Sequence, residues 1–127
     1  MKTKITVVLA MLSGIAIGGI TVNGLNAQAK PKAYSIFEVE VIDRDAARIY
    51  TPLIQAAYRS AGATIHETAG GKIVALEGTP PKVVSLIEWP SLDQAETFFN
   101  SAAWKDLAPQ RDKGIKFTRR FIVEATK

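Results

Sequence analysis

Three charged residues stand in otherwise apolar, alternating segments and have side chains suited to chemistry. Glu38 and Glu88 are carboxylates, and Arg120 carries a guanidinium. A carboxylate in an apolar cavity either pairs with a guanidinium or has its pKa raised by desolvation, and the second case would make it a general base. The alternative interpretation is a charge-paired centre that fixes the register of a dimer, or solvent exposure near strand ends.

The other candidate for proton transfer is His66, the only histidine of the chain, which lies in a short strand-like run beside Glu67. It could act as a proton shuttle. A metal centre is not expected, because one histidine without any cysteine leaves only carboxylates to complete the site. The sequence has no nucleophile-elbow or glycine-rich phosphate motif, and no bound cofactor is expected.

Five further side chains could line a pocket for a small apolar or aromatic molecule. They are Tyr34, Ile36, Leu86, Trp104 and Ile122. Strand alternation predicts that all of them except Trp104 share one sheet face with the three charged candidates. The alternative is that the aromatic rings belong to the core or to a dimer interface, where they contribute large buried area.

The segment from Val83 to Asp112 joins a strand to a helix. The β-branched run from Val83 to Trp89 ends at Pro90, and the apolar spacing then becomes helical. Ser91 is placed to cap this helix. The helix is expected to bury Leu92, Ala95 and Phe99, to break at Asn100-Ser101, and to make no further turn after Pro109.

The segments before this joint predict a strand, a helix and a hairpin. Residues 33–41 alternate as a strand, and a helix capped by Asp43 closes at Gly62. Pro52 either kinks this helix or begins a second segment capped by Thr51. Residues 63–67 and 72–77 are strand-like runs separated by Gly70-Gly71, and this pattern predicts a hairpin. Residues 115–124 form the last strand.

This order of elements predicts an α+β fold of the ferredoxin-like βαββαβ type with an extra β-hairpin. Right-handed crossovers put both helices on one face of an antiparallel sheet. The other face is left open with Tyr34, Ile36, Leu86 and Ile122 on it, and a monomer seldom exposes so much contiguous apolar surface. We therefore expect a second copy of the chain to cover this face as a homodimer.

Charge and cysteine content exclude some classes of protein. The chain has 16 basic and 12 acidic residues; Lys2 and Lys4 precede residue 30, which leaves a net charge of about +2 beyond them, too little for a nucleic-acid partner. The basic residues between Arg111 and Arg120 are expected to form a solvated rim, with Arg111 paired to Asp112 at the surface. There is no cysteine, so a modest core must hold the domain together unaided, and an oligomer would help it.

Residues 1–29 are typical of a secretory signal. Lys2 and Lys4 form its positive start, residues 5–22 carry no charge, and Ala27-Gln28-Ala29 supplies the small-x-small pattern. Cleavage after Ala29 would leave residues 30–127 as a periplasmic or secreted domain. The alternative is an uncleaved membrane anchor, since the uncharged run is at the short edge of a bilayer span.

Residues 32 to 124 resemble domain-of-unknown-function family 1330, a branch of the dimeric α+β barrel superfamily. The resemblance is carried by KAYSIFEVEV, by Gly70-Gly71 followed by KIVALEG, by VSLIEWPSLDQAETFFNS and by RRFIVEA. It implies a homodimer whose two sheets pack face to face around a cavity, and it implies no substrate. Some superfamily relatives bind haem through a histidine in helical surroundings, which the strand-like position of His66 does not match.

The expected function is therefore an exported homodimer that binds a small, partly apolar molecule in a cavity between the sheet and its partner. One alternative is a small cofactor-independent oxygenase or isomerase that uses Glu38 or Glu88 as its base and Arg120 to stabilise an anion. A second alternative is a structural or interaction protein whose cavity is filled.

Overall fold

The computed structural model describes residues 30–126, so the predicted signal segment at 1–29 lies outside the described residues. Between 30 and 126 no helix is long and apolar enough to cross a membrane. A strand and a long helix come first, followed by two strands, three helices and a last strand. They are β1 (Ala33–Val41), α2 (Arg44–Ser60), β2 (Thr64–His66), β3 (Val83–Trp89), α3 (Leu92–Phe99), α4 (Ala102–Lys105), α5 (Ala108–Gly114) and β4 (Ile115–Glu124).

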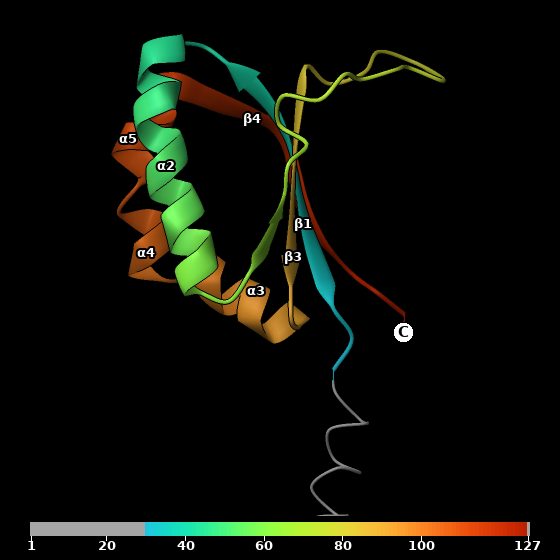
Figure 1. The fold of residues 1–127 in the computed structure, drawn as a ribbon, viewed down its shortest axis with the longest axis vertical. Helices are drawn as coiled ribbons and strands as arrows, with labels where there is room; N and C mark the ends of the chain where they lie inside the picture. The colour runs from blue at the N-terminus through green and yellow to red at the C-terminus, as the bar shows by residue number, and fades with distance from the viewer. Residues whose placement is uncertain (1–29, 127) are drawn as a thin grey trace, which may run out of the picture. The chain divides into compact units, whose positions relative to one another are not determined.

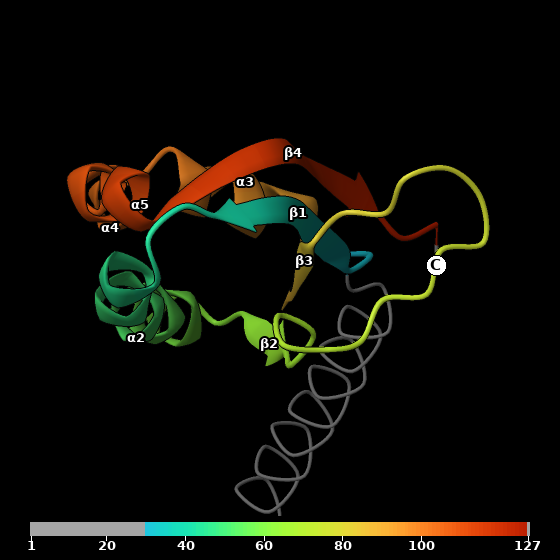
Figure 2. The same cartoon turned by 90° about the horizontal axis from the view of Figure 1, so that it is seen from above.

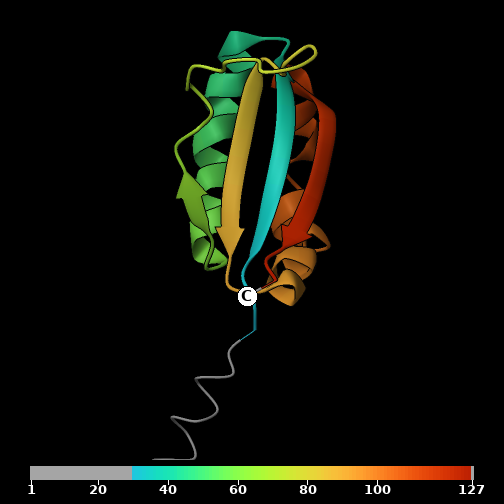
Figure 3. The ribbon, with the colours of Figure 1, turned by 90° about the vertical axis from the view of Figure 1, so that its right-hand side faces the viewer.

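The four strands form one antiparallel sheet in the order β2-β3-β1-β4. Helices α2 to α5 lie on one side of this sheet (Figure 1), and the other side, here called the open face, faces the viewer in Figure 3. The ferredoxin-like fold predicted from the sequence is confirmed. Strand β1 lies between β3 and β4 and pairs with both of them. The β1 residue that each β3 or β4 residue pairs with therefore shows which face of the sheet its side chain occupies.

The predicted helix starts are confirmed. Asp43 accepts a hydrogen bond from the backbone of Ala46 at 3.0 Å, and Ser91 accepts one from the backbone of Gln94 at 3.2 Å. Helix α2 runs without interruption through Pro52. The Thr51 hydroxyl donates to the carbonyl of Ala47, so the alternative in which Thr51 caps a second helix was wrong.

Aromatic rings from the sheet and from α2, α3 and α4 build the core. Trp89 is fully buried and donates its indole N–H to the hydroxyl of Ser35, also fully buried, at 3.0 Å. The Phe37 ring stacks on Phe117 and Trp104, with centroid distances of 5.1 Å and 6.0 Å. The indole nitrogen of Trp89 and the hydroxyl of Ser35 thus satisfy each other inside this core, and its rings fix how α4 sits against the sheet.

The predicted hairpin was wrong in its second half. Strand β2 is shorter than expected and pairs with β3, while residues 72–77 belong to no strand. Residues 67–82, here called the 67–82 loop, leave the sheet and extend away from the helices, on the side of the open face (Figures 1 and 2). Gly71 closes a turn onto the carbonyl of Thr68 at 3.0 Å, but this turn directs the chain away from β2 and not back along it.

The expectation that no helical turn follows Pro109 was also wrong. Pro109 lies in the first turn of α5, where a missing backbone N–H costs nothing because that N–H would have no partner in the helix. The last residue of α5, Gly114, touches the start of α2, and its carbonyl accepts hydrogen bonds from the backbone of Ile42 and Asp43 at 2.9 Å and 3.1 Å. Helix α5 is thereby fixed against α2.

We expect Gly114→Ala to lower the free energy of unfolding by about 1–3 kcal/mol, the usual cost of overpacking. A Cβ at this position would lie 2.5 Å from the backbone nitrogen of Ala47 and 2.8 Å from the carbonyl carbon of Ala46, and helix backbone cannot move aside cheaply. Gly70→Ala is the control, because a Cβ there meets nothing within 4 Å. Denaturant unfolding measures both, and equal midpoints would contradict this account of the contact.

Candidate functional site

A β-bulge in β4 decides which face each of its side chains occupies. Glu38 pairs with Arg119, but the next residue of β1, Val39, pairs with Phe117, so Thr118 is the extra residue. The bulge reverses the alternation beyond it. Arg119, Phe121 and Val123 therefore lie on the open face.

The prediction that Arg120 and Ile122 lie on the open face was wrong for the same reason. Arg120 pairs with Phe37 and Ile122 pairs with Ser35, and both of these β1 residues face the helices. Ile122 packs against the core. The guanidinium of Arg120 lies 5.8 Å from the Trp104 ring centroid and 5.5 Å from that of Phe117.

Glu38 forms an ion pair with Arg119 on the open face. The Arg119 Nη2 donates to Glu38 Oε1 at 3.0 Å, and Arg119 Nε donates to Oε2. Hydrogen bonding from Arg119 lowers the pKa of Glu38, against the opposing effect of desolvation. A general base working near neutrality needs a raised pKa, so this carboxylate is arranged as an ion-pair partner.

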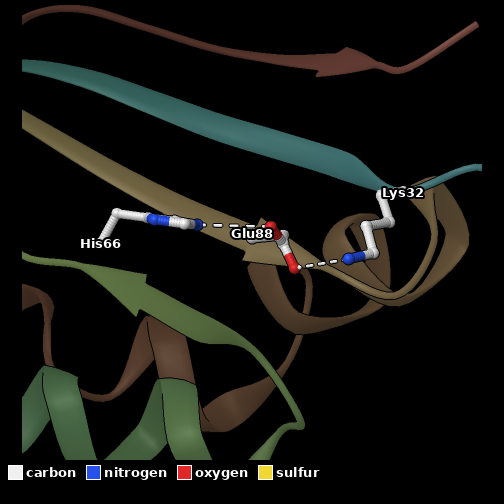
Figure 4. Close-up of polar contacts among 3 residues, drawn as sticks. All are labelled: Lys32, His66 and Glu88. Carbon is white, nitrogen blue, oxygen red and sulfur yellow. Dashed lines mark hydrogen bonds and ion pairs between the residues drawn. The ribbon is translucent and has the colours of Figure 1, made fainter.

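Glu88 occupies the centre of a second polar cluster, shown in Figure 4. Lys32 Nζ lies 3.1 Å from Glu88 Oε2, and His66 Nε2 lies 3.3 Å from Glu88 Oε1. The hydrogen bond from Lys32 is the main cause that lowers the pKa of Glu88, and His66 adds to it. His66 thus meets Glu88 across β2 and β3, in a strand as predicted, and its side chain is 42% exposed.

The three charged candidates do not converge. Glu38 pairs with Val84 and Glu88 pairs with Tyr34, so the two carboxylates are separated by four residues along β1, or about 13 Å. Arg120 lies on the opposite side of the sheet. Within residues 30–126, no group of three acidic, histidine or cysteine side chains could hold a metal ion.

The open face carries three of the five predicted ligand-lining residues. Ile36 pairs with Leu86 on one side and with Phe121 on the other, which makes an apolar row across three strands. Tyr34 continues this surface toward Val123. Trp104 is buried in the core and Ile122 packs against it, so neither belongs to this face.

A cavity lies between α2 and the sheet, on the side opposite the predicted one. Its volume is about 510 Å³. Most of its lining is apolar or aromatic, and the polar side chains come from α2, from β3 and from the region of β2. The lining includes Phe37, Tyr50, Ile54, Tyr58, Ser85 and Ile87. The cavity predicted from the sequence, between the open face and a partner sheet, would need a second copy of the chain. It stays a prediction.

Two tyrosines on one face of α2, Tyr50 and Tyr58, line this cavity. Burial raises the pKa of Tyr50, and a hydrogen bond with Arg111 partly offsets that rise. Burial also raises the pKa of Tyr58, well above its ordinary value of 10. Both phenols are therefore protonated at neutral pH, and each is able to donate a hydrogen bond.

Arg111 was missed by the sequence analysis, which placed it on a solvated rim in a surface pair with Asp112. Its residue is only 9% exposed, and its guanidinium carbon lies 4.2 Å from the centroid of the Trp104 ring. The Asp112 carboxylate is 3.7 Å away and is itself mostly exposed. A signal existed: Trp104, Leu107 and Arg111 are spaced by three and four, the spacing of one helical face.

Comparison with known proteins gives the family. The model of a domain of unknown function, DUF1330, matches residues 32–126. The chain belongs to the DUF1330 family. The predicted resemblance is confirmed, and it extends over nearly all of the described residues. No curated protein matches the chain.

Several solved structures share the mixed α+β, ferredoxin-like fold of this chain. A protein of unknown function from Rhodopseudomonas palustris has a TM-score of 0.62 at 13% identity, over 84% of this chain and 92% of that one. SnoaB, a cofactor-independent oxygenase from Streptomyces nogalater, has a TM-score of 0.50 at 8% identity, over 76% and 95%. HapK from Hahella chejuensis has a TM-score of 0.50 at 11% identity, over 73% and 91%. At these identities the likeness is one of fold.

We expect Glu38→Gln to flatten the loss of stability in acid. The pKa of Glu38 is lowered in the folded state from its ordinary value of 4.5, so its contribution is fully present above that value and is lost as pH falls through the lowered one. The variant is accordingly less stable than wild type at pH 7, and the two melting temperatures approach each other below pH 4.5.

Glu96→Gln, an exposed change on α3, is the matched control for loss of one carboxylate. Thermal unfolding followed from pH 7 down to about pH 3 measures all three proteins. A constant difference between wild type and Glu38→Gln over that range would show that the ion pair with Arg119 does not set the pKa of Glu38.

Proposed function

We propose that this DUF1330 protein binds a small, largely apolar molecule in the cavity between α2 and the sheet. The observation that carries the proposal is the cavity itself, about 510 Å³ in volume and lined mainly by apolar and aromatic side chains. Ligand sites commonly have this size and this kind of lining, with a few polar groups that orient the ligand. Here the hydroxyls of Tyr50 and Ser85 are among those polar groups.

A purely structural or interaction protein was expected to have a filled cavity. The open space in this cavity therefore favours a binding role. A binding role is also favoured over an oxygenase or isomerase with a carboxylate base. Glu38 and Glu88 have lowered pKa values and stand in ion pairs, and neither lines the cavity. The likeness to SnoaB concerns the fold and assigns no base to this chain.

A cavity-filling variant tests the site. We expect Ser85→Leu to weaken binding of the uncharged fluorescent probe N-phenyl-1-naphthylamine at least about tenfold, because the larger side chain extends from β3 into the cavity. Ser60→Leu, at the exposed end of α2, is the matched control. Fluorescence titration measures affinity. Unchanged affinity in a folded Ser85→Leu protein would remove the proposed site.

We also propose that the protein is a homodimer whose two open faces meet. The row formed by Leu86, Ile36 and Phe121 would be covered by its copy, and burial of apolar surface of this kind drives association. The 67–82 loop supports a partner on this side. Its Val74 and Leu76 are 69% and 94% exposed, and the loop extends past the open face, where a docked copy would meet it (Figure 2).

We expect Ile36→Asp to convert this dimer to a monomer, because a carboxylate in the centre of the apolar row would be buried without a partner. Leu53→Asp, on the exposed surface of α2, should leave the dimer intact. Sedimentation velocity at micromolar concentration measures both. Wild-type protein that sediments as a monomer at tens of micromolar would overturn the proposed assembly.

Export to the periplasm or the exterior is proposed as well, and it rests on the sequence pattern of residues 1–29. The domain described at 30–126 contains no cysteine and so needs no disulfide in that compartment. Mass spectrometry of the protein from the exported fraction is expected to find Lys30 as the first residue. A chain that keeps Met1 in the membrane fraction would favour the alternative, an uncleaved anchor.

A further inference from the structure

A second hollow lies where the end of β1, α5 and the start of β4 meet. Its volume is about 550 Å³, and we call it the basic pocket. Three of its lining residues are cations and one is acidic, while the other three give it an apolar wall. They are Arg111, Lys116, Arg120, Asp112, Ile42, Ile115 and Phe117. The pocket thus combines positive charge with apolar surface, a mixture typical of sites for organic anions.

The positive charge of Arg111 is held almost inside the protein. The residue is 9% exposed, and its Nη1 is buried without a hydrogen-bond partner among residues 30–126. The Trp104 ring below the guanidinium supplies a cation–π contact, but not a negative charge. A buried cation that lacks a full counter-charge is costly, so the position gains from an anion supplied to the pocket.

Because of the bulge at Thr118, the guanidinium of Arg120 also lies at the basic pocket. Arg120 lies close to the rings of Trp104 and Phe117, over which Arg111 also sits, at 4.2 Å and 5.8 Å from the two centroids. Without the extra residue, Arg120 would point to the open face. Two like charges over one pair of rings repel each other, and an anion between them would relieve that repulsion.

The protein itself supplies little counter-charge here. Asp112 approaches Arg111 at 3.7 Å, but its side chain is 74% exposed and therefore screened by water. In the described part of the chain, neither Lys116 nor Arg120 forms an ion pair. The basic pocket therefore has a net positive charge that a ligand could neutralise.

We propose that the basic pocket binds a small organic carboxylate, with its carboxylate group held by Arg120 and Arg111 and its apolar part on Phe117 and Ile115. Guanidinium groups match the planar geometry of a carboxylate and bind it through paired hydrogen bonds. The apolar wall favours an organic anion over a free inorganic one. This site is separate from the cavity under α2, although Ile115 and Phe117 line both.

The test compares 2-naphthoate with its uncharged analogue 2-naphthamide, and with inorganic phosphate, by calorimetric titration of the full chain. We expect 2-naphthoate to bind at least about tenfold more tightly than 2-naphthamide, because charge-assisted hydrogen bonds are made only by the acid. Equal affinity for the acid and the amide, or no binding of the acid at millimolar concentration, would overturn the proposal. Equally strong binding of inorganic phosphate would overturn the assignment to an organic anion.

Arg120 is the residue to vary, because a change of the buried Arg111 would also disturb its packing against Trp104. We expect Arg120→Gln to weaken 2-naphthoate binding about tenfold and Arg120→Lys to restore part of the loss, since the charge returns without the planar fork. Arg59→Gln, in the last turn of α2, is the matched control. Equal affinities for Arg120→Gln and Arg59→Gln would contradict the proposed site.

The Ser85→Leu protein separates this proposal from that of the cavity under α2. It is expected to bind 2-naphthoate as wild type does while losing the uncharged probe. If Ser85→Leu instead abolishes 2-naphthoate binding, the acid occupies the larger cavity and the basic pocket is not its site.

Discussion

The pairing of β1 with β4 is the constraint on which the surfaces of this protein depend. One extra residue, Thr118, sits opposite the step from Glu38 to Val39 and inverts every side chain of β4 beyond it. Arg119 thereby becomes the partner of Glu38, and Phe121 completes the apolar row of the open face. Arg120 goes to the other side of the sheet, where the charge of Arg111 already lies. A single local irregularity thus separates a neutral apolar face from a basic pocket.

The helical side of the sheet is shaped by aromatic packing and by the close approach of α5 to α2. The stacked rings of Phe37, Trp104 and Phe117 give Arg111 a surface to lie on, and the contact at Gly114 holds α5 in place. A buried arginine is usually paired with a carboxylate, whereas the Arg111 guanidinium is stabilised mainly by contact with the faces of aromatic rings. One of these rings, Phe117, lines both the cavity under α2 and the basic pocket, so two sites of different chemistry lie close together.

Much of the fold could be predicted from the sequence, because alternation in β1 and β3 and the caps at Asp43 and Ser91 are local signals. Which side chains of β4 lie on which face of the sheet could not be predicted. Phe121, Ile122 and Val123 are apolar in succession, so either alternation of the strand fits them. Pro109 was equally ambiguous, because a proline ends one helix or begins another. The site prediction was wrong where it depended on those two features: Arg120 was placed on the open face and Arg111 on the surface.

The ion pairs on the open face have a consequence for how a partner would recognise it. Glu38 is neutralised by Arg119 and Glu88 by Lys32, so each of these two carboxylates is balanced by a cation of the same subunit. At these positions a docking partner would meet short-range dipoles beside the apolar row, and such dipoles steer an approaching molecule only weakly. Association there would accordingly depend little on ionic strength and would proceed at the slower rates of unsteered encounters.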